Sequence, residues 1–184
     1  MNPSMATVSP SWTCAAIASR MLRSLDPVAP DTPRPAVGLA PRGDGRPVLT
    51  LPGLVNSDLS NIVMRRYLDA LGYRALPWEL GRNFGPRAIG TEGERLFERI
   101  AAIHDETGEK VTLIGVSLGW IMARVAAHRH PELVREVITV SSPFAGLPTA
   151  TNVWRVFELV CGQRADDPAV RAWLEEAATP LPVP

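Results

Sequence analysis

The stretch that decides the fold is VTLIGVSLGW, residues 111–120. Its first six residues are almost all apolar or β-branched, which is typical of a strand buried in the middle of a sheet. The letters G-x-S-x-G overlap the end of this strand, with Ser117 at the centre and Gly115 and Gly119 two residues away on either side. Apolar residues then recur at helical spacing, at Leu118, Ile121, Met122, Val125 and Ala126. The segment therefore predicts a strand, a sharp turn at Ser117, and a helix.

A serine at such a turn is the arrangement called a nucleophile elbow. The strained turn lifts the hydroxyl above the carboxyl end of the sheet, and small residues on either side let the strand and helix backbones approach. The positive end of the following helix then faces the place where an oxyanion would form. The pattern predicts Ser117 as a catalytic nucleophile; the alternative is a tight strand-to-helix turn with an incidental serine.

Strand-like and helix-like segments alternate four times between residues 48 and 142. Besides 111–116, the predicted strands are 48–51, 73–80 and 134–142, and the helices before the central strand cover 59–71 and 96–103. Ser57 or Asp58 is expected to cap the first of these helices, and Pro77 should place its strand toward a sheet edge. This alternation predicts an α/β fold, with a central, mostly parallel sheet of about four strands flanked by helices.

The turn after the first predicted strand reads LPGLVNSD, residues 51–58. In a nucleophile-elbow arrangement this loop supplies one backbone N–H to the oxyanion, and the residue after the nucleophile supplies the other. By position these donors are Leu54 and Leu118, and Gly53 permits the sharp backbone path between strand and donor. A plain strand-ending turn is the alternative interpretation of this loop.

Three segments together resemble the core of α/β-hydrolase-fold proteins of the esterase and lipase kind: PVLTLPGL (47–54), VTLIGVSLG (111–119) and VREVITVSSPFAG (134–146). The resemblance implies a serine nucleophile, an acyl-enzyme intermediate, and the chain order serine, acid, histidine. Trp120 departs from it, because relatives usually carry a small residue there; its bulk either crowds the pocket or packs in the core.

This resemblance divides the chain into three expected parts. Residues 1–46 hold a short amphipathic helix and a proline-rich extension, since six prolines between 26 and 47 exclude a long helix. Residues 47–146 form the α/β-hydrolase core. Residues 147–184 form a helical, lid-like tail with helices over 152–162 and 168–178, the second capped by Asp167.

Composition narrows the classes of partner. The formal net charge is zero, so electrostatic capture of nucleic acid is not expected, and no apolar run approaches the roughly 20 residues of a membrane-spanning helix. Cys14 and Cys161 match no metal or redox spacing, so we expect reduced thiols, no metal, no cofactor and a cytoplasmic location. The expected partner is a small-molecule ester or lipid-like substrate.

The proton acceptor that a serine nucleophile needs is missing from the predicted site. His128 and His130 end the helix that begins after Ser117, about 15 Å from its start, and His104 precedes a strand about 20 Å long. No carboxylate follows the fourth strand directly, and Glu175 and Glu176 are expected on a solvated helix face. We therefore expect a sequence cut short at its C-terminal end, with strand 134–142 left as an open apolar edge.

Two hypotheses follow. The first is a serine hydrolase of carboxylic esters that acts through an acyl-enzyme at Ser117, with little or no activity in this chain alone. The second is a non-catalytic remnant or binding module of the same fold. A nucleotide-binding domain is disfavoured because neither G-x-G-x-x-G nor G-x-x-x-x-G-K-[ST] occurs.

Overall fold

The computed structural model describes residues 42–141, 158, 162, 164 and 167–183. Every described residue lies in the unit Pro41–Pro184. The predicted N-terminal helix and nearly all of the predicted helix 152–162 fall outside the described residues. The three-part division at residues 46 and 146 stays a prediction.

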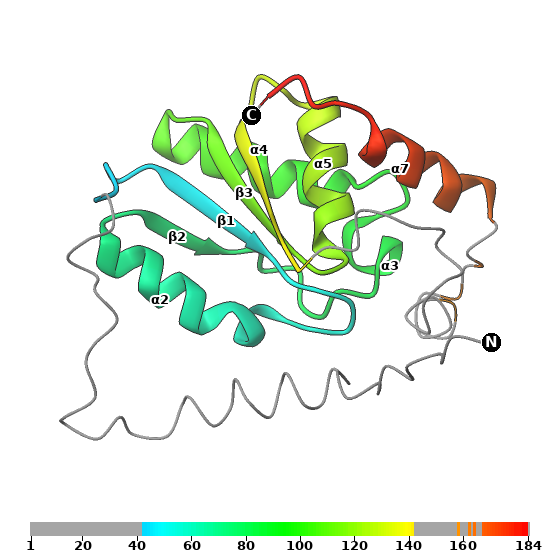
Figure 1. The fold of residues 1–184 in the computed structure, drawn as a ribbon, viewed down its shortest axis with the longest axis horizontal. Helices are drawn as coiled ribbons and strands as arrows, with labels where there is room; N and C mark the ends of the chain where they lie inside the picture. The colour runs from blue at the N-terminus through cyan, green and yellow to red at the C-terminus, as the bar shows by residue number, and fades with distance from the viewer. Residues whose placement is uncertain (1–41, 142–157, 159–161, 163, 165–166, 184) are drawn as a thin grey trace, which may run out of the picture. The chain divides into compact units, whose positions relative to one another are not determined.

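Four parallel strands form the sheet of the described unit (Figure 1). They are β1 (Pro47–Leu51), β2 (Arg74–Pro77), β3 (Val111–Val116) and β4 (Val134–Val140), in the spatial order β2-β1-β3-β4. The predicted α/β class, the central place of 111–116 and the edge position of the strand with Pro77 are confirmed.

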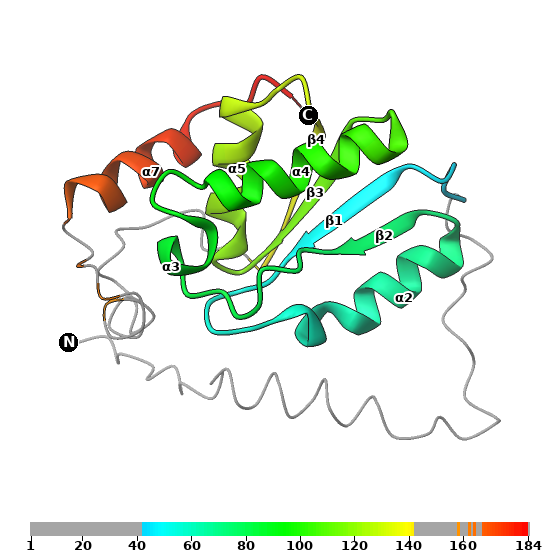
Figure 2. The same ribbon diagram turned by 180° about the vertical axis from the view of Figure 1, so that it is seen from behind.

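Helices cover both faces of this sheet. Helices α4 (Glu94–Thr107) and α5 (Gly119–Arg129) pack on the face that carries Leu49 and Leu113, and Figure 2 looks onto the molecule from the side of α4. Helix α2 (Ile62–Leu71) covers the other face, where the Arg65 guanidinium donates to the Thr50 hydroxyl. All five residues of β1 are buried. Because successive side chains of a strand point to opposite faces of the sheet, β1 is covered on both faces.

The predicted helical spacing identifies the core side of α4 correctly. Leu96, Ile100 and Ile103 are all fully buried against the sheet. The helix ends at Gly108, whose φ of 68° gives the left-handed C-cap that glycine adopts without strain. Helix α5 is buried along most of its length and ends at Arg129, before Pro131.

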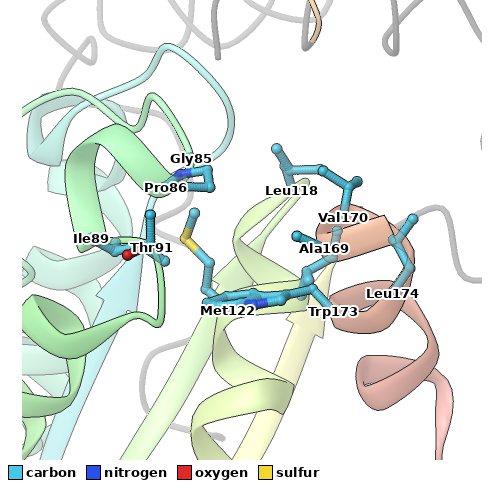
Figure 3. Close-up of a pocket in the computed structure, with 11 residues that line it drawn as sticks. Gly85, Pro86, Ile89, Thr91, Leu118, Met122, Ala169, Val170, Trp173 and Leu174 are labelled. Atoms are coloured by element: carbon cyan, nitrogen blue, oxygen red, sulfur yellow. The ribbon is translucent and has the colours of Figure 1, made fainter. Parts of the chain in front are cut away.

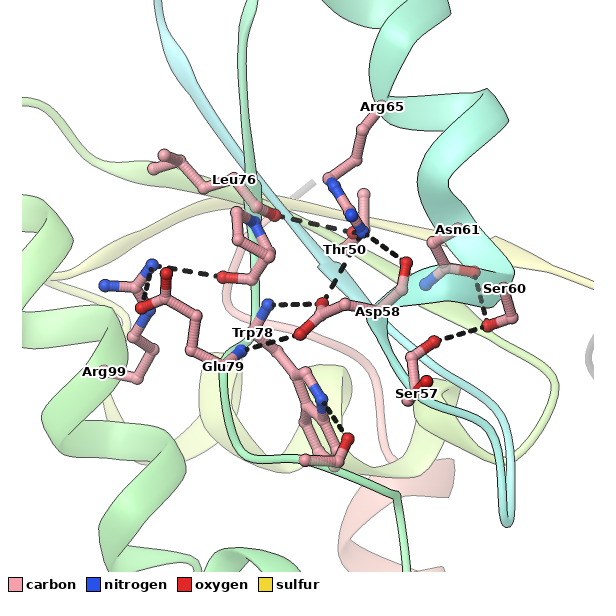
Figure 4. A network of polar contacts seen from close by, with 12 residues as sticks. Thr50, Ser57, Asp58, Ser60, Asn61, Arg65, Leu76, Trp78, Glu79 and Arg99 are labelled. Carbon is pink, nitrogen blue, oxygen red and sulfur yellow. Dashed lines mark hydrogen bonds and ion pairs between the residues drawn. The ribbon is translucent and has the colours of Figure 1, made fainter.

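The predicted cap of the first helix is wrong. Residues Asp58–Asn61 form a 3₁₀-helix, η2, and neither Ser57 nor Asp58 caps a helix through its side chain. The Asp58 carboxylate instead accepts hydrogen bonds from the backbone N–H groups of Trp78 (2.9 Å) and Glu79 (3.1 Å), as Figure 4 shows. These two amides at the end of β2 compete successfully for the carboxylate, so the side chain ties β2 to η2 and leaves the helix start uncapped.

Two further helices belong to the described unit. The short α3 (Pro86–Ile89) was not predicted, whereas α7 (Pro168–Ala178) matches its predicted range. The side chain of Asp167 caps α7 as predicted, accepting a hydrogen bond from the Ala169 amide at 2.9 Å.

Helix α7 is anchored to α5 by Arg129. The guanidinium binds both carboxylate oxygens of Glu176, at 3.0 Å and 2.9 Å, and its carbon lies 5.2 Å from the ring centroid of Trp173. The Glu176 carboxylate raises the pKa of Arg129. Arg124, one turn earlier, donates to the Thr179 carbonyl at 2.6 Å. The prediction that Glu176 lies on a solvated face is therefore wrong, because α5 presents a cation to it.

Strand β4 forms one edge of the sheet as described. It pairs with β3, and within the described residues no strand lies on its other side. Ile138 and Val140, on the face away from α5, are 44% and 38% exposed. The predicted open apolar edge thus exists in the described part of the chain.

Replacing Arg129 by methionine tests the anchor of α7. The variant Arg129→Met keeps most of the apolar side chain but leaves the partly buried Glu176 without its cation, so the free energy of unfolding should fall by about 2 kcal/mol. Urea denaturation measures the change. The control is Arg74→Met, whose partner Glu106 is exposed and whose loss should cost less than about 1 kcal/mol. Equal losses in the two variants would contradict the anchoring role.

Candidate active site

Ser117 lies at the turn between β3 and α5, where the carboxyl end of the central strand meets the start of the helix. Its φ is 47°, in the left-handed region that non-glycine residues avoid. Its backbone N–H donates to the Val140 carbonyl at 2.9 Å, which ties the turn to the end of β4. Such a strained backbone persists because its neighbours hold it, and residues of this kind concentrate at functional sites.

The two glycines of G-x-S-x-G stand where backbone segments touch. A Cβ on Gly115 would lie 2.7 Å from the Gly119 carbonyl oxygen and 2.7 Å from Trp120 Cα. A Cβ on Gly119 would lie 2.7 Å from the Leu51 carbonyl oxygen, at the end of β1. Neither position has room for a side chain, so the start of α5 rests directly on the ends of β3 and β1.

The loop after β1 forms a second strained turn. The backbone N–H of Asn56 donates to the Gly53 carbonyl at 3.1 Å, which closes a turn over residues 53–56. Val55, the third residue of this turn, has a φ of 58°. A positive φ at the third position defines a type II turn, which normally places glycine or asparagine there. A β-branched residue in this conformation is an outlier whose cost must be offset by its surroundings.

These two turns meet at one point of the sheet. The chain leaves β1 toward β2 on one side and later returns to β3 on the other, so the gap between the ends of β1 and β3 is the point where ligands bind in open α/β sheets. A Cβ on Gly53 would lie 3.1 Å from the Cβ of Ser117 and 3.4 Å from Nδ2 of Asn56. Gly53 therefore lets the loop after β1 approach the serine.

The predicted oxyanion donors are unoccupied amides. Among the residues that the structure describes, neither the Leu54 nor the Leu118 backbone N–H donates a hydrogen bond, and the Ser117 hydroxyl has no partner either. Leu118 is 7% exposed, so solvent has little access to its backbone amide. Backbone N–H groups are nearly always paired in proteins, and two free ones beside an unpaired hydroxyl are a place for an oxygen-bearing ligand.

Asn83 holds the loop after β1 in place. It is fully buried, and its side-chain amide donates to the Pro52 carbonyl at 2.7 Å. Sequence reasoning missed this residue. The signal was present in LGRNFGP (80–86), where an asparagine lies between two glycines of a loop, because asparagine side chains commonly bind nearby backbone groups.

An apolar pocket is lined in part by Leu118, the residue after Ser117 (Figure 3). The Leu118 side chain forms part of its wall, and the cavity has a volume of about 60 Å³, enough for several methylene groups or waters. Helices α3, α5 and α7 and the residues that flank α3 and α5 supply the walls, through Gly85, Pro86, Ile89, Thr91, Leu118, Ile121, Met122, Ala169, Val170, Trp173 and Leu174. The contribution of α7 was not predicted, because only the fold brings it to α5.

All three histidines lie at the opposite end of the unit. His104 is in the last turn of α4 and His128 is in the last turn of α5, about 15 Å along that helix from Ser117; His130 follows the end of α5 directly. His128 Nε2 lies 2.9 Å from the Thr179 hydroxyl, and His130 Nδ1 lies 3.2 Å from a carboxylate oxygen of Glu132. His128 and His130 thus have structural partners, whereas the buried Nδ1 of His104 makes no hydrogen bond among the described residues. None of the three is placed to accept the serine proton.

Other features bear on what the site holds. Trp120 is 6% exposed and packs with Ile121, Val125 and Val170, so its bulk lies in the core between α5 and α7. In the described part of the chain, no group of three histidine, cysteine or acidic residues is arranged to hold a metal. No described helix is long and apolar enough to cross a bilayer.

Taken together, the parallel order β2-β1-β3-β4, the helices on both faces and the sharp corner after β3 decide the architecture. The described unit has a partial α/β-hydrolase fold. Neither a family model nor a curated protein matches the sequence.

Solved structures of several hydrolases are similar to this chain. The pyrethroid hydrolase PytH has a TM-score of 0.43 and 22% identity, over 53% of this chain and 40% of its own. The lipase BlEst2 of Bacillus licheniformis, in mature form, has a TM-score of 0.47 and 18% identity, over 76% of this chain and 59% of its own. An esterase from a marine microorganism has a TM-score of 0.40 and 17% identity, over 74% and 60%. The chain thus spans between 40% and 60% of these proteins, and its reaction has to be argued from its own site.

Substituting Gly115 tests the backbone contact beneath the serine. Gly115→Ala places a methyl group against the backbone of α5, so the free energy of unfolding should fall by about 3 kcal/mol. The control is Gly81→Ala, where φ is 77° but the space is empty, and only the left-handed strain of about 1 kcal/mol is expected. Thermal and urea unfolding report both values. A Gly115→Ala chain as stable as the control would show that the corner is looser than described.

Proposed function

We propose that the described unit is the nucleophile-bearing part of a serine hydrolase of carboxylic esters. The observation that carries this proposal is the meeting of three groups at one corner: the strained Ser117 and the free backbone amides of Leu54 and Leu118. Acyl transfer uses such a set, since a hydroxyl attacks the carbonyl carbon while two amides stabilise the oxyanion that forms on the carbonyl oxygen.

In the proposed reaction, Ser117 Oγ forms a bond to the ester carbonyl carbon and gives up its proton to a base. The tetrahedral intermediate carries its negative charge on the former carbonyl oxygen, within reach of the two amides and of the positive end of α5. Collapse breaks the bond to the alcohol oxygen, which leaves protonated, and an acyl group stays on Ser117. Water then hydrolyses this acyl-enzyme and restores the hydroxyl.

The chain as given supplies no imidazole for the proton transfer. We therefore propose that it turns over esters at a residual rate, since an oxyanion hole and binding alone retain about 10³- to 10⁴-fold over water. The same observation supports the second candidate, a binding module that holds an ester or acyl group without cleaving it. The two candidates differ in whether an acyl group is transferred to residue 117.

The pocket supports a substrate with an apolar acyl group. Its walls are almost wholly hydrophobic, and Leu118 belongs to both the pocket and the proposed oxyanion hole. A carbonyl oxygen bound at the Leu118 amide therefore brings the attached chain to the pocket mouth. Pocket and amides together favour small esters or lipid-like esters over polar ones.

A thiol at position 117 tests the nucleophile without a histidine. A cysteine ionises at a pKa near 8.5, so at pH 9 the Ser117→Cys chain carries a thiolate that needs no base. With nitrophenyl hexanoate we expect a fast phase of one equivalent of nitrophenolate per chain, ahead of any slower reaction of Cys14 and Cys161, with the acyl group of the fast phase on the peptide spanning 111–120. The rate should exceed that of N-acetylcysteine amide by about 100-fold, because two amides stabilise the oxyanion.

Ser117→Ala is the control, and it should give no adduct on that peptide. Acylation of the 117 thiol no faster than the free thiol would rule out a formed oxyanion hole, and with it the hydrolase proposal. A fast thiol in Ser117→Cys with no turnover by wild type would instead favour the binding module.

A bulky residue at the pocket rim tests the acyl site. Ala169 is exposed and lines the pocket, so Ala169→Trp should block its mouth without disturbing the core. In the Ser117→Cys background, acylation by nitrophenyl octanoate should slow by about 10-fold, while acylation by the acetate ester stays within about twofold. The control is Ala172→Trp, on the same helix and also exposed but outside the pocket lining. Equal slowing of both esters would place the acyl chain elsewhere.

A further inference from the structure

Asn83 is a buried polar residue in a loop that sequence patterns leave unexplained. It lies between Gly81 and Gly85, after β2, and its side chain is fully buried. A buried amide is costly unless its hydrogen bonds are made, so a loop that keeps one there gains something from those bonds.

Both ends of the Asn83 side chain are used. Nδ2 donates to the Pro52 carbonyl at 2.7 Å, and Oδ1 accepts from the Gly85 amide at 3.0 Å. Nδ2 also lies 3.7 Å from the sulfur of Met122, a residue of the pocket wall. The side chain therefore joins the loop after β1 to the loop that leads into α3.

The Asn83 backbone makes two more bonds to the same loop. The Val55 amide donates to the Asn83 carbonyl at 2.8 Å, and the Asn83 amide donates to the Asn56 carbonyl at 2.8 Å. Together with the side-chain bond to Pro52, these contacts fall on both sides of Gly53 and Leu54. The two residues between the fixed points are those that approach Ser117 and carry the free amide.

We propose that Asn83 is a positioning residue that holds the Leu54 amide in the oxyanion hole, an inference that rests on the proposed function. Val55 occupies a left-handed conformation that is unfavourable for a β-branched residue and persists only where the surroundings fix it. Without the bond to Pro52, the turn can relax toward negative φ at Val55, and the Leu54 amide rotates away from the carbonyl oxygen. A displacement of about 1 Å is enough to cost about 100-fold in rate.

The same residue sets the pocket wall. Gly85, whose amide binds Asn83, and Pro86 line the apolar pocket across from Leu118. The Asn83 side chain thus fixes both the loop that carries the Leu54 amide and the pocket wall at Gly85. A substrate held by both would have its carbonyl oxygen and its chain placed relative to each other by this one side chain.

The test compares Asn83→Ala with Asn61→Ala in the Ser117→Cys background. Asn61 is also buried, at 4% exposed, but its side-chain nitrogen has no partner among the described residues. Acylation by nitrophenyl acetate is measured against ester concentration, at a temperature where unfolding curves show every variant folded. For Asn83→Ala we expect the maximal rate constant to fall by about 100-fold, with the half-saturating concentration changed by less than about threefold. For Asn61→Ala both should stay within about twofold.

A second variant and a second readout guard against misfolding. Asn83→Ser keeps a hydroxyl that reaches only one of the two partners, and it should lose about 10-fold. In ¹⁵N spectra, Asn83→Ala and Asn83→Ser should shift the Leu54 and Val55 amide signals and leave that of Leu118 in place. Rates at the level of Asn61→Ala, or unmoved Leu54 and Val55 signals, would overturn the proposal for Asn83.

The outcomes separate this inference from the function on which it rests. Fast acylation of the 117 thiol that survives Asn83→Ala keeps the hydrolase site and rejects the positioning role. Slow acylation already in the Ser117→Cys parent rejects the hydrolase site itself. In that case the shift of the Leu54 signal still decides whether Asn83 holds the loop.

Discussion

The structure depends on one close contact, between the first turn of α5 and the end of β1. At Gly119 the helix backbone comes so near the Leu51 carbonyl oxygen that a Cβ would lie 2.7 Å from it. A helix can start there only if the chain turns sharply after β3, and the turn forces Ser117 into a left-handed conformation. The same contact brings the serine beside Gly53 and the loop after β1. The position of the candidate nucleophile is thus a consequence of how the helix packs on the sheet.

The elements around this corner hold it in two ways. Hydrogen bonds of the buried Asn83 fix the strained loop that carries the Leu54 amide. They offset the unfavourable free energy of the left-handed Val55 conformation. Ionic and hydrogen-bonding contacts of Arg124 and Arg129 fix α7 against α5, which gives the apolar pocket a wall that belongs to the core. Polar groups therefore set the geometry of the site, and apolar groups provide the space beside it.

Regular periodicity made much of the fold predictable. The apolar strand before Ser117 and the buried stripe of Leu96, Ile100 and Ile103 are predicted correctly. In both elements the buried side recurs at the period of the strand or helix, so the spacing of apolar residues reveals it. The cap at Asp58 and the solvated face at Glu176 were wrong, because each carboxylate has a partner that is remote in sequence. The pocket was missed for the same reason, whereas a local signal for Asn83, an asparagine between two glycines of a loop, was present. Local patterns show where the corner lies, whereas its supports come from tertiary contacts that spacing does not encode.

The central claim is that two backbone amides flank Ser117 and receive the oxyanion. A crystal structure of the chain after reaction with an alkyl fluorophosphonate tests it most directly, since the phosphonyl oxygen stands in for the oxyanion. The account predicts this oxygen at about 2.7–3.1 Å from the amide nitrogens of both Leu54 and Leu118. An adduct on Ser117 whose oxygen points to solvent, or that contacts neither amide, would contradict it.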